Sequence, residues 1–416
     1  MPPDMELDIE EIIKKLSVVQ EGDLQLYTYS PDEFSDGGSM LTKSMPVFYN
    51  PIQELNRSIT LIAYKAYQEE HMTNHPDVPL KILDSMAASG IRSLRLTLFL
   101  ADPHEIFAND LNPLALSLIQ KNMELNSITK HIATSNQDCN LLMSEWGASH
   151  RFSHIIDLDP FGTPNYFIPN AVRTISNGGL LGVTATDTPV LFGVRPSACL
   201  RKYNVTALRS SFCKEVGLRI LLHYIAKQAH PWMRYIEPVM ALSFDHYVRV
   251  FVRIKKGKEG ITHNLENFGY ILWCPQCDWR DSVHLNILDA SSRCPLCDSK
   301  VKFGGPLWIG KLHDSDFVLR CTTIAENSTQ QTIPSIKRII KTLSYLPHEN
   351  QLPLGYYNIH KLCDKYQISV SSMVKIENAI KAEGFDYSRT HIEPHAIKSN
   401  IDIPTLSRIL HALAKE

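Results

Sequence analysis

The sequence lacks any run of about 18 apolar residues, which is roughly what a helix needs to cross a membrane. Residues 1–11 are acidic and lack the apolar core of a secretory signal peptide. Nine cysteines, an odd number, argue against a disulfide framework and fit a reducing compartment. These absences exclude membrane-spanning and disulfide-rich secreted classes, and they predict a cytoplasmic protein that does not contact a membrane.

The chain is long enough for several domains and is unevenly charged. It has 416 residues, of which 44% are hydrophobic and 21% charged, and about 150 residues per domain predicts two or three domains. Ten acids and two lysines give residues 1–36 a net charge of −8, so the other 380 residues carry +6. A mildly basic body is compatible with a polyanionic partner, although solvated surface often shows the same asymmetry.

Short apolar runs alternate with helical patterns in the first half of the chain. We expect helices over residues 56–70, 92–100 and 113–126, and strands over residues 81–84, 105–110, 154–159 and 179–186. This alternation is typical of an α/β domain, in which a parallel sheet has helices on both faces and binds ligands at the carboxyl ends of its strands. Polar clusters around Asp84, Asp110 and Asp159 lie at such ends.

The composition changes near residue 260. A cysteine-bearing segment is followed by a Gly304-Gly305-Pro306 break and then by a helix-rich segment with apolar residues at helical spacing. We predict four parts: an N-terminal arm (1–45), an α/β domain (46–260), a cysteine module with a connector (261–330), and a helix-rich α+β C-terminal domain (331–416).

Two Cys-x-x-Cys pairs lie sixteen residues apart, and they comprise Cys274, Cys277, Cys294 and Cys297. Two such pairs can supply four thiolates to one tetrahedral zinc ion. The alternative is four buried thiols or a redox pair, which two pairs in one short segment make less favourable. Four protein ligands leave no open coordination position, so the zinc is predicted to be structural.

The turn after the first strand enters a helix without the G-x-G-x-x-G pattern that cradles a pyrophosphate. A ligand with a ribose and a zwitterionic tail fits this turn better. Asp110, twenty residues after Gly90, is placed to accept from ribose hydroxyls. Asp138 could accept from an adenine amino group, and Cys139 could add a backbone and an apolar contact. Together these residues suggest S-adenosylmethionine, although each acid alone could be structural or solvated.

The segment Asp157-Leu-Asp-Pro-Phe-Gly162 follows an apolar strand and brings an acid, a proline carbonyl and an aromatic ring together. This combination suits an amine attached to a flat base, with Asp159 accepting from the amine and Phe161 stacking on the ring. Phe48 and Tyr49 are rival stacking residues. The alternative is a tight turn at the strand end with Phe161 in the core.

At these residues the chain resembles the tRNA guanine-26 N2-dimethyltransferase family. The matching stretches lie in order after residue 40 and cover residues 47–51, 56–57, 87–92, 108–110, 157–162, 184–187, 199–203, 245–250, 304–308 and 388–391. The resemblance implies a class I, Rossmann-like methyltransferase fold. It also implies S-adenosylmethionine contacts at Arg57, Arg92, Asp110, Asp138 and Cys139. Arg57 is expected to pair with the methionine carboxylate, although either arginine could instead lie on the surface or hold phosphate.

The resemblance further implies transfer of two methyl groups to the exocyclic N2 amine of guanine 26 in tRNA, with no obligatory protein partner. Expected RNA contacts are Arg195, Arg201 and Lys202, with Arg209 and the stretches 388–391 and 397–400 as further candidates. Two rival hypotheses are an amino-methyltransferase acting on ribosomal RNA or DNA, and a non-catalytic zinc-containing RNA-binding protein.

Overall fold

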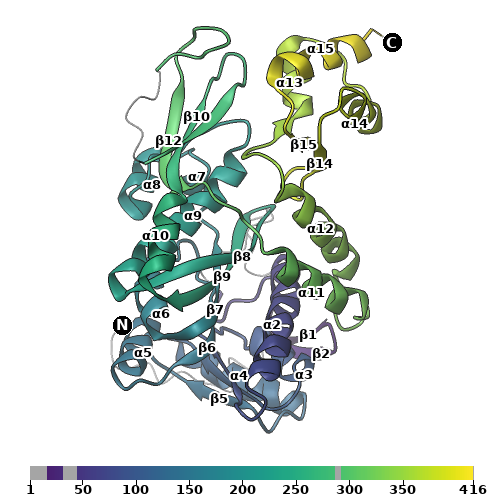
Figure 1. Cartoon of the computed structure of the whole chain (residues 1–416). Helices are drawn as coiled ribbons and strands as arrows, with labels where there is room; N and C mark the ends of the chain where they lie inside the picture. The colour runs from purple at the N-terminus through teal and green to yellow at the C-terminus, as the bar shows by residue number, and fades with distance from the viewer. Residues whose placement is uncertain (1–15, 31–44, 286–291, 416) are drawn as a thin grey trace. The chain divides into compact units, whose positions relative to one another are not determined.

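The computed structural model describes residues 16–30, 45–285 and 292–415, which form two compact units (Figure 1). The first unit comprises the chain up to Leu158 together with Thr323–Ile339, and the second comprises Asp159–Thr322 and Ile340–Glu416. Within the described ranges, no helix is both long and apolar enough to cross a membrane.

Four parallel strands form the centre of the first unit, in the order β5 (Ile132–Ser135), β4 (His104–Asn109), β3 (Leu80–Asp84) and β6 (Ser153–Leu158). Ile82 of β3 lies opposite Ile106 of β4 and Ile155 of β6, and all three side chains are fully buried. Strands covered on both faces bury apolar residues on both sides, and the apolar centres of β3, β4 and β6 explain why these short runs could be recognised in the sequence.

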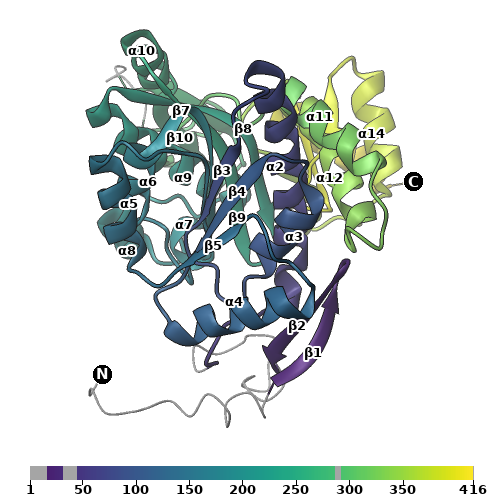
Figure 2. The same ribbon diagram turned by 90° about the horizontal axis from the view of Figure 1, so that it is seen from below.

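Helices cover both sides of these strands. They are α2 (Glu54–Asn74), α3 (Ile91–Phe99), α4 (Pro113–Leu125) and α5 (Cys139–Ala148), and a short 3-10 turn, η2 (Pro51–Gln53), precedes α2. Figure 2 shows α2 and α3 on one side of β3 and β4, and α5 on the other. The ring of Phe107 in β4 meets Trp146 of α5 edge to face at 5.0 Å. The predicted parallel sheet with helices on both faces is therefore confirmed.

A hairpin of β1 (Leu16–Glu21) and β2 (Leu24–Tyr29) lies within the segment predicted to be an arm. Leu24 and Leu26 are fully buried in a cluster with residues of α3. The side chain of Asn122 in α4 accepts from the Tyr27 amide at 2.7 Å and donates to the Tyr27 carbonyl at 3.2 Å. These bonds satisfy the edge of β2 and hold the hairpin beside α4 (Figure 2).

The second unit contains three antiparallel strands in the order β7 (Ile175–Ala185), β9 (Tyr247–Lys256) and β8 (Arg234–Phe244). The long helix α9 (Cys213–Ala229) is almost entirely buried and contacts β8 and β9. The other helices of this region are α6 (Ile168–Thr174), α7 (Thr188–Leu191), α8 (Pro196–Tyr203), η3 (His230–Trp232) and α10 (Lys258–Glu266).

The cysteine module is a three-stranded antiparallel sheet in the order β11 (Arg280–His284), β10 (Phe268–Trp273) and β12 (Lys302–Trp308). After α11 (Ser315–Glu326) and α12 (Ile336–Glu349), a second small sheet packs with helices around Ile376, Ile397 and Leu406. The strands of this sheet are β13 (Tyr357–Asn358), β14 (Tyr387–Arg389) and β15 (Ala396–Ser399). The helices are α13 (Ile359–Tyr366), α14 (Met373–Ala382) and α15 (Ile403–Leu413). The C-terminal region is thus helix-rich α+β, as predicted.

Buried charges join α9 to this small sheet. Glu215 accepts from Lys398 Nζ at 2.8 Å and from Arg219 Nη2 at 2.7 Å. Burial alone would raise the pKa of Glu215, but the two cations lower it far below its usual range. Lys398 is only 2% exposed, so it cannot serve as a surface contact for RNA.

A second buried acid, Glu349, takes up polar groups of the stretch 388–391 in the same way, so these groups are not available to RNA. Thr390 and the backbone amide of His391 both donate to Glu349, and the His391 side chain is buried. The expectation that Thr390, His391 and Lys398 grip phosphates and ribose hydroxyls is therefore wrong. These polar residues satisfy buried carboxylates instead.

His223 of α9 gives the second unit a pH-dependent stability. The residue is 3% exposed and its ring lies 4.5 Å from that of Phe268. Burial lowers its pKa to about 4, whereas an unfolded histidine titrates near its usual 6.5. As the pH falls from 6.5 towards 4, His223 binds a proton in the unfolded chain but stays neutral in the folded chain. The free energy of unfolding therefore decreases in this pH range.

We predict that His223→Phe removes part of this acid sensitivity. The free energy of unfolding should fall between pH 7 and pH 4.5 by about 2–3 kcal/mol less in the variant than in the parent chain. Urea unfolding at the two pH values measures the difference. An identical pH dependence in both proteins would show that His223 is protonated as easily when folded as when unfolded.

Candidate functional site

The turn between β3 and α3 lies at the carboxyl ends of the parallel strands. The Ala87 amide donates to the Asn109 carbonyl at 2.8 Å, and the Ser85 side chain donates to the Asp157 carbonyl at 2.6 Å. Gly90 begins α3 with φ +79°, and a Cβ there would lie 2.9 Å from Ile119. Glycine is therefore required by both backbone conformation and space.

Asp110 directly follows β4 and clamps this turn. Its Oδ2 accepts from the Ala88 amide at 2.8 Å, and its Oδ1 accepts from the Asn112 amide at 2.9 Å. Burial raises the pKa of Asp110, although these backbone donors oppose the shift. Each carboxylate oxygen keeps a further lone pair, so the residue can hold the turn and still accept from two hydroxyl groups.

Asp138 and Cys139 start α5, which follows β5. Asp138 caps the helix, because its Oδ1 accepts from the Asn140 and Leu141 amides at 2.9 and 3.0 Å. Its Oδ2 makes no hydrogen bond to the residues that the structure describes, and the side chain is exposed. Cys139 is buried, and burial raises its pKa to about 12, so it presents a neutral thiol. An exposed acceptor beside an apolar contact fits the edge of an amino-bearing ring.

Arg57 and Arg92 lie on α2 and α3, and both are 6% exposed. Arg92 Nη1 donates to Thr60 Oγ1 at 3.1 Å and lies 3.5 Å from Asp157 Oδ2. Arg57 Nε donates to Glu21 Oε1 at 2.7 Å, and Nη2 donates to Glu21 Oε2. The arginine predicted to meet a ligand carboxylate is thus already paired with a protein carboxylate, and Glu21 is a partner that sequence reasoning missed.

The loop predicted to be catalytic begins directly after β6. Asp159 is partly buried, Pro160 is buried, and Phe161 is 55% exposed. The alternative that places Phe161 in the core is therefore wrong. Gly162 has φ +96°; its amide donates to Thr186 Oγ1 at 2.8 Å, and its carbonyl accepts from the Thr186 amide at 2.9 Å. These bonds hold the loop with its aromatic ring presented to solvent.

A buried tyrosine supports the same loop. Tyr203 of α8 is fully buried; its hydroxyl lies 2.9 Å from Thr163 Oγ1 and donates to Asp187 Oδ1 at 2.9 Å. Burial, together with the Asp187 charge, raises the pKa of Tyr203 well above its usual value. Tyr203 and Asp187 lie within motifs that the sequence matched to the family, but nothing local to them revealed this contact.

The three predicted RNA-contacting residues have different surroundings. Arg195 and Arg201 lie at the start and on the outer face of α8, and both are exposed. The Lys202 ammonium is instead 3.1 Å from Asp187 Oδ2, and its side chain is 21% exposed. Lys202 therefore contributes to the network beneath the loop, whereas the two arginines are open to a polyanion.

The four paired cysteines converge in the cysteine module. Cys274 Sγ lies 3.5 Å from Cys297 Sγ, and Cys277 Sγ lies 3.4 Å from Cys294 Sγ. Two thiolates on a tetrahedral zinc are separated by about 3.8 Å, so the donor set fits this ion. The turns that follow the two Cys-x-x-Cys pairs are alike. The Asp278 amide donates to the Cys274 carbonyl and the Asp298 amide to the Cys294 carbonyl, each at 2.9 Å, and both aspartates have positive φ. This repetition explains why the spacing alone predicted that the four cysteines converge.

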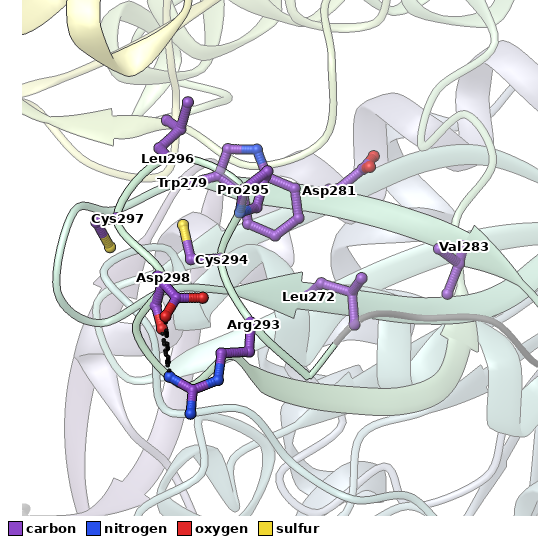
Figure 3. Close-up of a pocket in the computed structure, with 10 residues that line it drawn as sticks. All are labelled: Leu272, Trp279, Asp281, Val283, Arg293, Cys294, Pro295, Leu296, Cys297 and Asp298. Atoms are coloured by element: carbon purple, nitrogen blue, oxygen red, sulfur yellow. Dashed lines mark hydrogen bonds and ion pairs between the residues drawn. The ribbon is translucent and has the colours of Figure 1, made fainter.

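A pocket of about 640 Å³ adjoins Cys294 and Cys297, and Figure 3 shows Trp279, Leu272 and the Arg293–Asp298 ion pair around it. None of the candidate cofactor or catalytic residues lines it. The pocket belongs to the cysteine module, and the candidate chemistry lies elsewhere in the fold.

The parallel strands, the acids at their carboxyl ends and the Asp159-Pro160-Phe161 loop define the fold as that of a class I methyltransferase. A family model, "N2,N2-dimethylguanosine tRNA methyltransferase", matches residues 29–411. The chain belongs to this family, which confirms the family and the fold class predicted from the motifs.

Individual relatives are similar in sequence to this chain along nearly their whole length. A tRNA (guanine(26)-N(2))-dimethyltransferase of Methanothermobacter thermautotrophicus is 32% identical over 91% of this chain and 96% of its own. The Aquifex aeolicus relative, named as acting on guanine 26 and guanine 27, is 32% identical over 90% of this chain and 92% of its own. Trm1 from Pyrococcus horikoshii, solved with S-adenosyl-L-methionine, has a TM-score of 0.80 at 30% identity and covers 95% of this chain and 100% of its own.

We predict that Cys294→Ser disrupts the cysteine module. Losing one of four thiolates should abolish stoichiometric zinc and lower the melting temperature, because zinc binding contributes to folding. Cys213→Ser, which removes a thiol outside the cluster, should keep one zinc per chain. Elemental analysis of protein purified without chelator measures this; a parent chain without zinc would contradict the assignment.

Proposed function

We propose that this chain is an S-adenosylmethionine-dependent tRNA (guanine-N2)-dimethyltransferase that places two methyl groups on the exocyclic amine of guanine 26. The observation that carries the proposal is the Asp159-Pro160-Phe161 loop, which presents an exposed ring and an acid at the carboxyl end of β6. The near full-length similarity to enzymes named for this reaction supports it.

The residues proposed to hold the cofactor are Asp110, Asp138, Cys139, Arg57 and Arg92. When bound, S-adenosylmethionine supplies an electrophilic methyl group on a sulfonium. The spare lone pairs of Asp110 suit the ribose hydroxyls, and the exposed Oδ2 of Asp138 suits the adenine amine. The arginines suit the methionine carboxylate. No glycine-rich phosphate loop is needed, because this ligand has no phosphate.

The chemical problem is the poor nucleophilicity of the guanine amine, whose lone pair is delocalised into the ring. Asp159 accepts a hydrogen bond from the amine and directs the lone pair toward the methyl group, while Phe161 holds the base in plane. As the N–C bond forms and the S–C bond breaks, the amine becomes acidic, and its proton leaves to Asp159 or to water. Asp159 therefore stabilises the positive charge that develops on the amine.

The proposed division of labour follows the predicted domains. Residues 46–260 carry methyl transfer, residues 261–330 form the zinc module and connector, and residues 331–416 bind tRNA, with residues 1–45 as the N-terminal segment. Because the target amine lies inside a folded tRNA, the base leaves its stack to reach the loop. Arg195, Arg201 and Lys202 are proposed to contribute to RNA binding, Lys202 only if it exchanges Asp187 for phosphate. We further propose that the protein acts in the cytoplasm and needs no obligatory protein partner.

Arg201→Ala is expected to weaken tRNA binding and to reduce its salt dependence. A phosphate contact releases counterions, so its loss should lower the slope of log affinity against log salt by about one. Cofactor affinity should not change. Lys130→Ala, which removes an exposed charge from α4's neighbouring loop, is the matched control. Filter binding across a salt series decides; an unaltered slope for Arg201→Ala would remove this residue from the interface.

Asp159→Asn and Asp159→Ala are expected to slow single-turnover methyl transfer by roughly 10²–10⁴, with Ala slower than Asn. Asn keeps an acceptor without the charge, and Ala loses both. Cofactor affinity and melting temperature should stay near those of the parent chain, because Asp110 and Asp138 are untouched. A well-folded Asp159→Ala enzyme with a near-normal rate would remove Asp159 from the mechanism. Loss of folding in both variants would make it a turn-former.

A further inference from the structure

Glu21 ends β1 and is buried among three side chains that donate four hydrogen bonds to it. Its Oε1 accepts from Arg57 Nε at 2.7 Å and from Arg95 Nη1 at 2.9 Å. Its Oε2 accepts from Arg57 Nη2 and from the Tyr49 hydroxyl at 3.1 Å. Burial alone would raise the pKa of Glu21, but the two guanidinium groups lower it below its usual value. The carboxylate is thus ionised and fully engaged.

These contacts leave one nitrogen of the Arg57 guanidinium group to bind a ligand. Nε and Nη2 are held by Glu21, and Nη2 also donates to the Asn50 carbonyl at 3.1 Å. The guanidinium carbon lies 5.3 Å from the centre of the Tyr49 ring. Nη1 makes no hydrogen bond to any residue that the structure describes. The guanidinium is therefore fixed in orientation with a single nitrogen, Nη1, left to donate.

Arg57 depends on Glu21 more than Arg95 does. Arg95 lies 3.8 Å from a second carboxylate, that of Glu54, and donates to Ser58 and to the Thr332 carbonyl. Among the described residues, the Glu21 carboxylate is the only one in ion-pair contact with Arg57. Removing Glu21 would leave Arg95 with a carboxylate partner, whereas Arg57 would keep, of the residues that the structure describes, only the Asn50 carbonyl as a hydrogen-bond acceptor and would lose its fixed orientation.

We propose that Glu21 is a positioning residue for the cofactor: it locks Arg57 so that Nη1 alone meets the methionine carboxylate of S-adenosylmethionine. This inference rests on the proposed function. It makes the β1–β2 hairpin part of the cofactor site, although Glu21 need not touch the cofactor. A fixed guanidinium loses less conformational entropy when it binds an anion than a mobile one does.

Glu21→Gln tests the proposal, because glutamine keeps the shape but turns an NH2 group toward donors. Two probes separate the carboxylate contact from the rest of the pocket: S-adenosylhomocysteine has the amino-acid tail, and 5′-methylthioadenosine lacks it. We expect Glu21→Gln to weaken S-adenosylhomocysteine about tenfold or more, the worth of a hydrogen bond to a charged group, with little change for 5′-methylthioadenosine. Isothermal titration gives both affinities without any turnover.

Three further variants complete the design. Arg57→Met should lose the same tail-dependent affinity, and Glu21→Gln combined with Arg57→Met should lose no more, since both act on one contact. Glu21→Asp keeps the charge but is too short to hold both Nε and Nη2 of Arg57, so we expect an intermediate loss of affinity for S-adenosylhomocysteine. This variant replaces Glu21→Gln if the latter folds poorly. Ser58→Ala, which disturbs the Arg95 side of the cluster, should leave the ratio of the two affinities unchanged.

Several outcomes would overturn the inference. An equal loss for both probes would mean that Glu21 only supports the pocket, and an additive double variant would mean that it does not act through Arg57. An unchanged affinity for S-adenosylhomocysteine would also contradict it. Failure of the parent chain to bind S-adenosylhomocysteine at all would instead defeat the proposed function.

Discussion

Parallel pairing of β3 with β4 and β6 is the constraint on which the candidate site depends. It brings the ends of three strands to one edge, where the backbone of residues 85–87 bonds to the carbonyls of Asn109 and Asp157. Asp110 then fixes the turn through the Ala88 amide. Because the turn is defined by backbone bonds and Gly90, the acids at this edge are held in place before any ligand arrives.

Buried charge is the second organising feature of both units. In the first, Arg57, Arg92 and Arg95 each face a carboxylate. In the second, Glu215 pairs with Lys398 and Arg219, and Glu349 contacts His391. Desolvating such groups is costly, and breaking one partner of a buried pair typically costs about 3–5 kcal/mol. These pairs therefore restrict where each chain segment can dock, and Glu21 shows how such a restriction can also orient a binding group.

Local patterns in the sequence predicted those features whose cause is local. The apolar strands and the two cysteine pairs each depend on a few neighbouring residues, and the structure contains the predicted strands and brings the four cysteines together. The β1–β2 hairpin could not be recognised in an acidic segment, because its partners are distant in sequence: Asn122 lies 95 residues after Tyr27, and Leu24 and Leu26 pack against α3. The interior roles of Lys398 and Thr390 were missed for the same reason: their partners, Glu215 and Glu349, lie far along the chain.

The account's central claim is methyl transfer to the N2 amine of guanine 26, and the modified nucleoside tests it most directly. One tRNA transcript carries guanine at position 26, and a second carries adenine there but is otherwise identical. After reaction with the chain and S-adenosylmethionine, nucleoside digests are analysed by mass spectrometry. The account predicts N2,N2-dimethylguanosine from the first transcript and none from the second. Equal dimethylguanosine from both transcripts, or methylation only at a ring nitrogen, would contradict it.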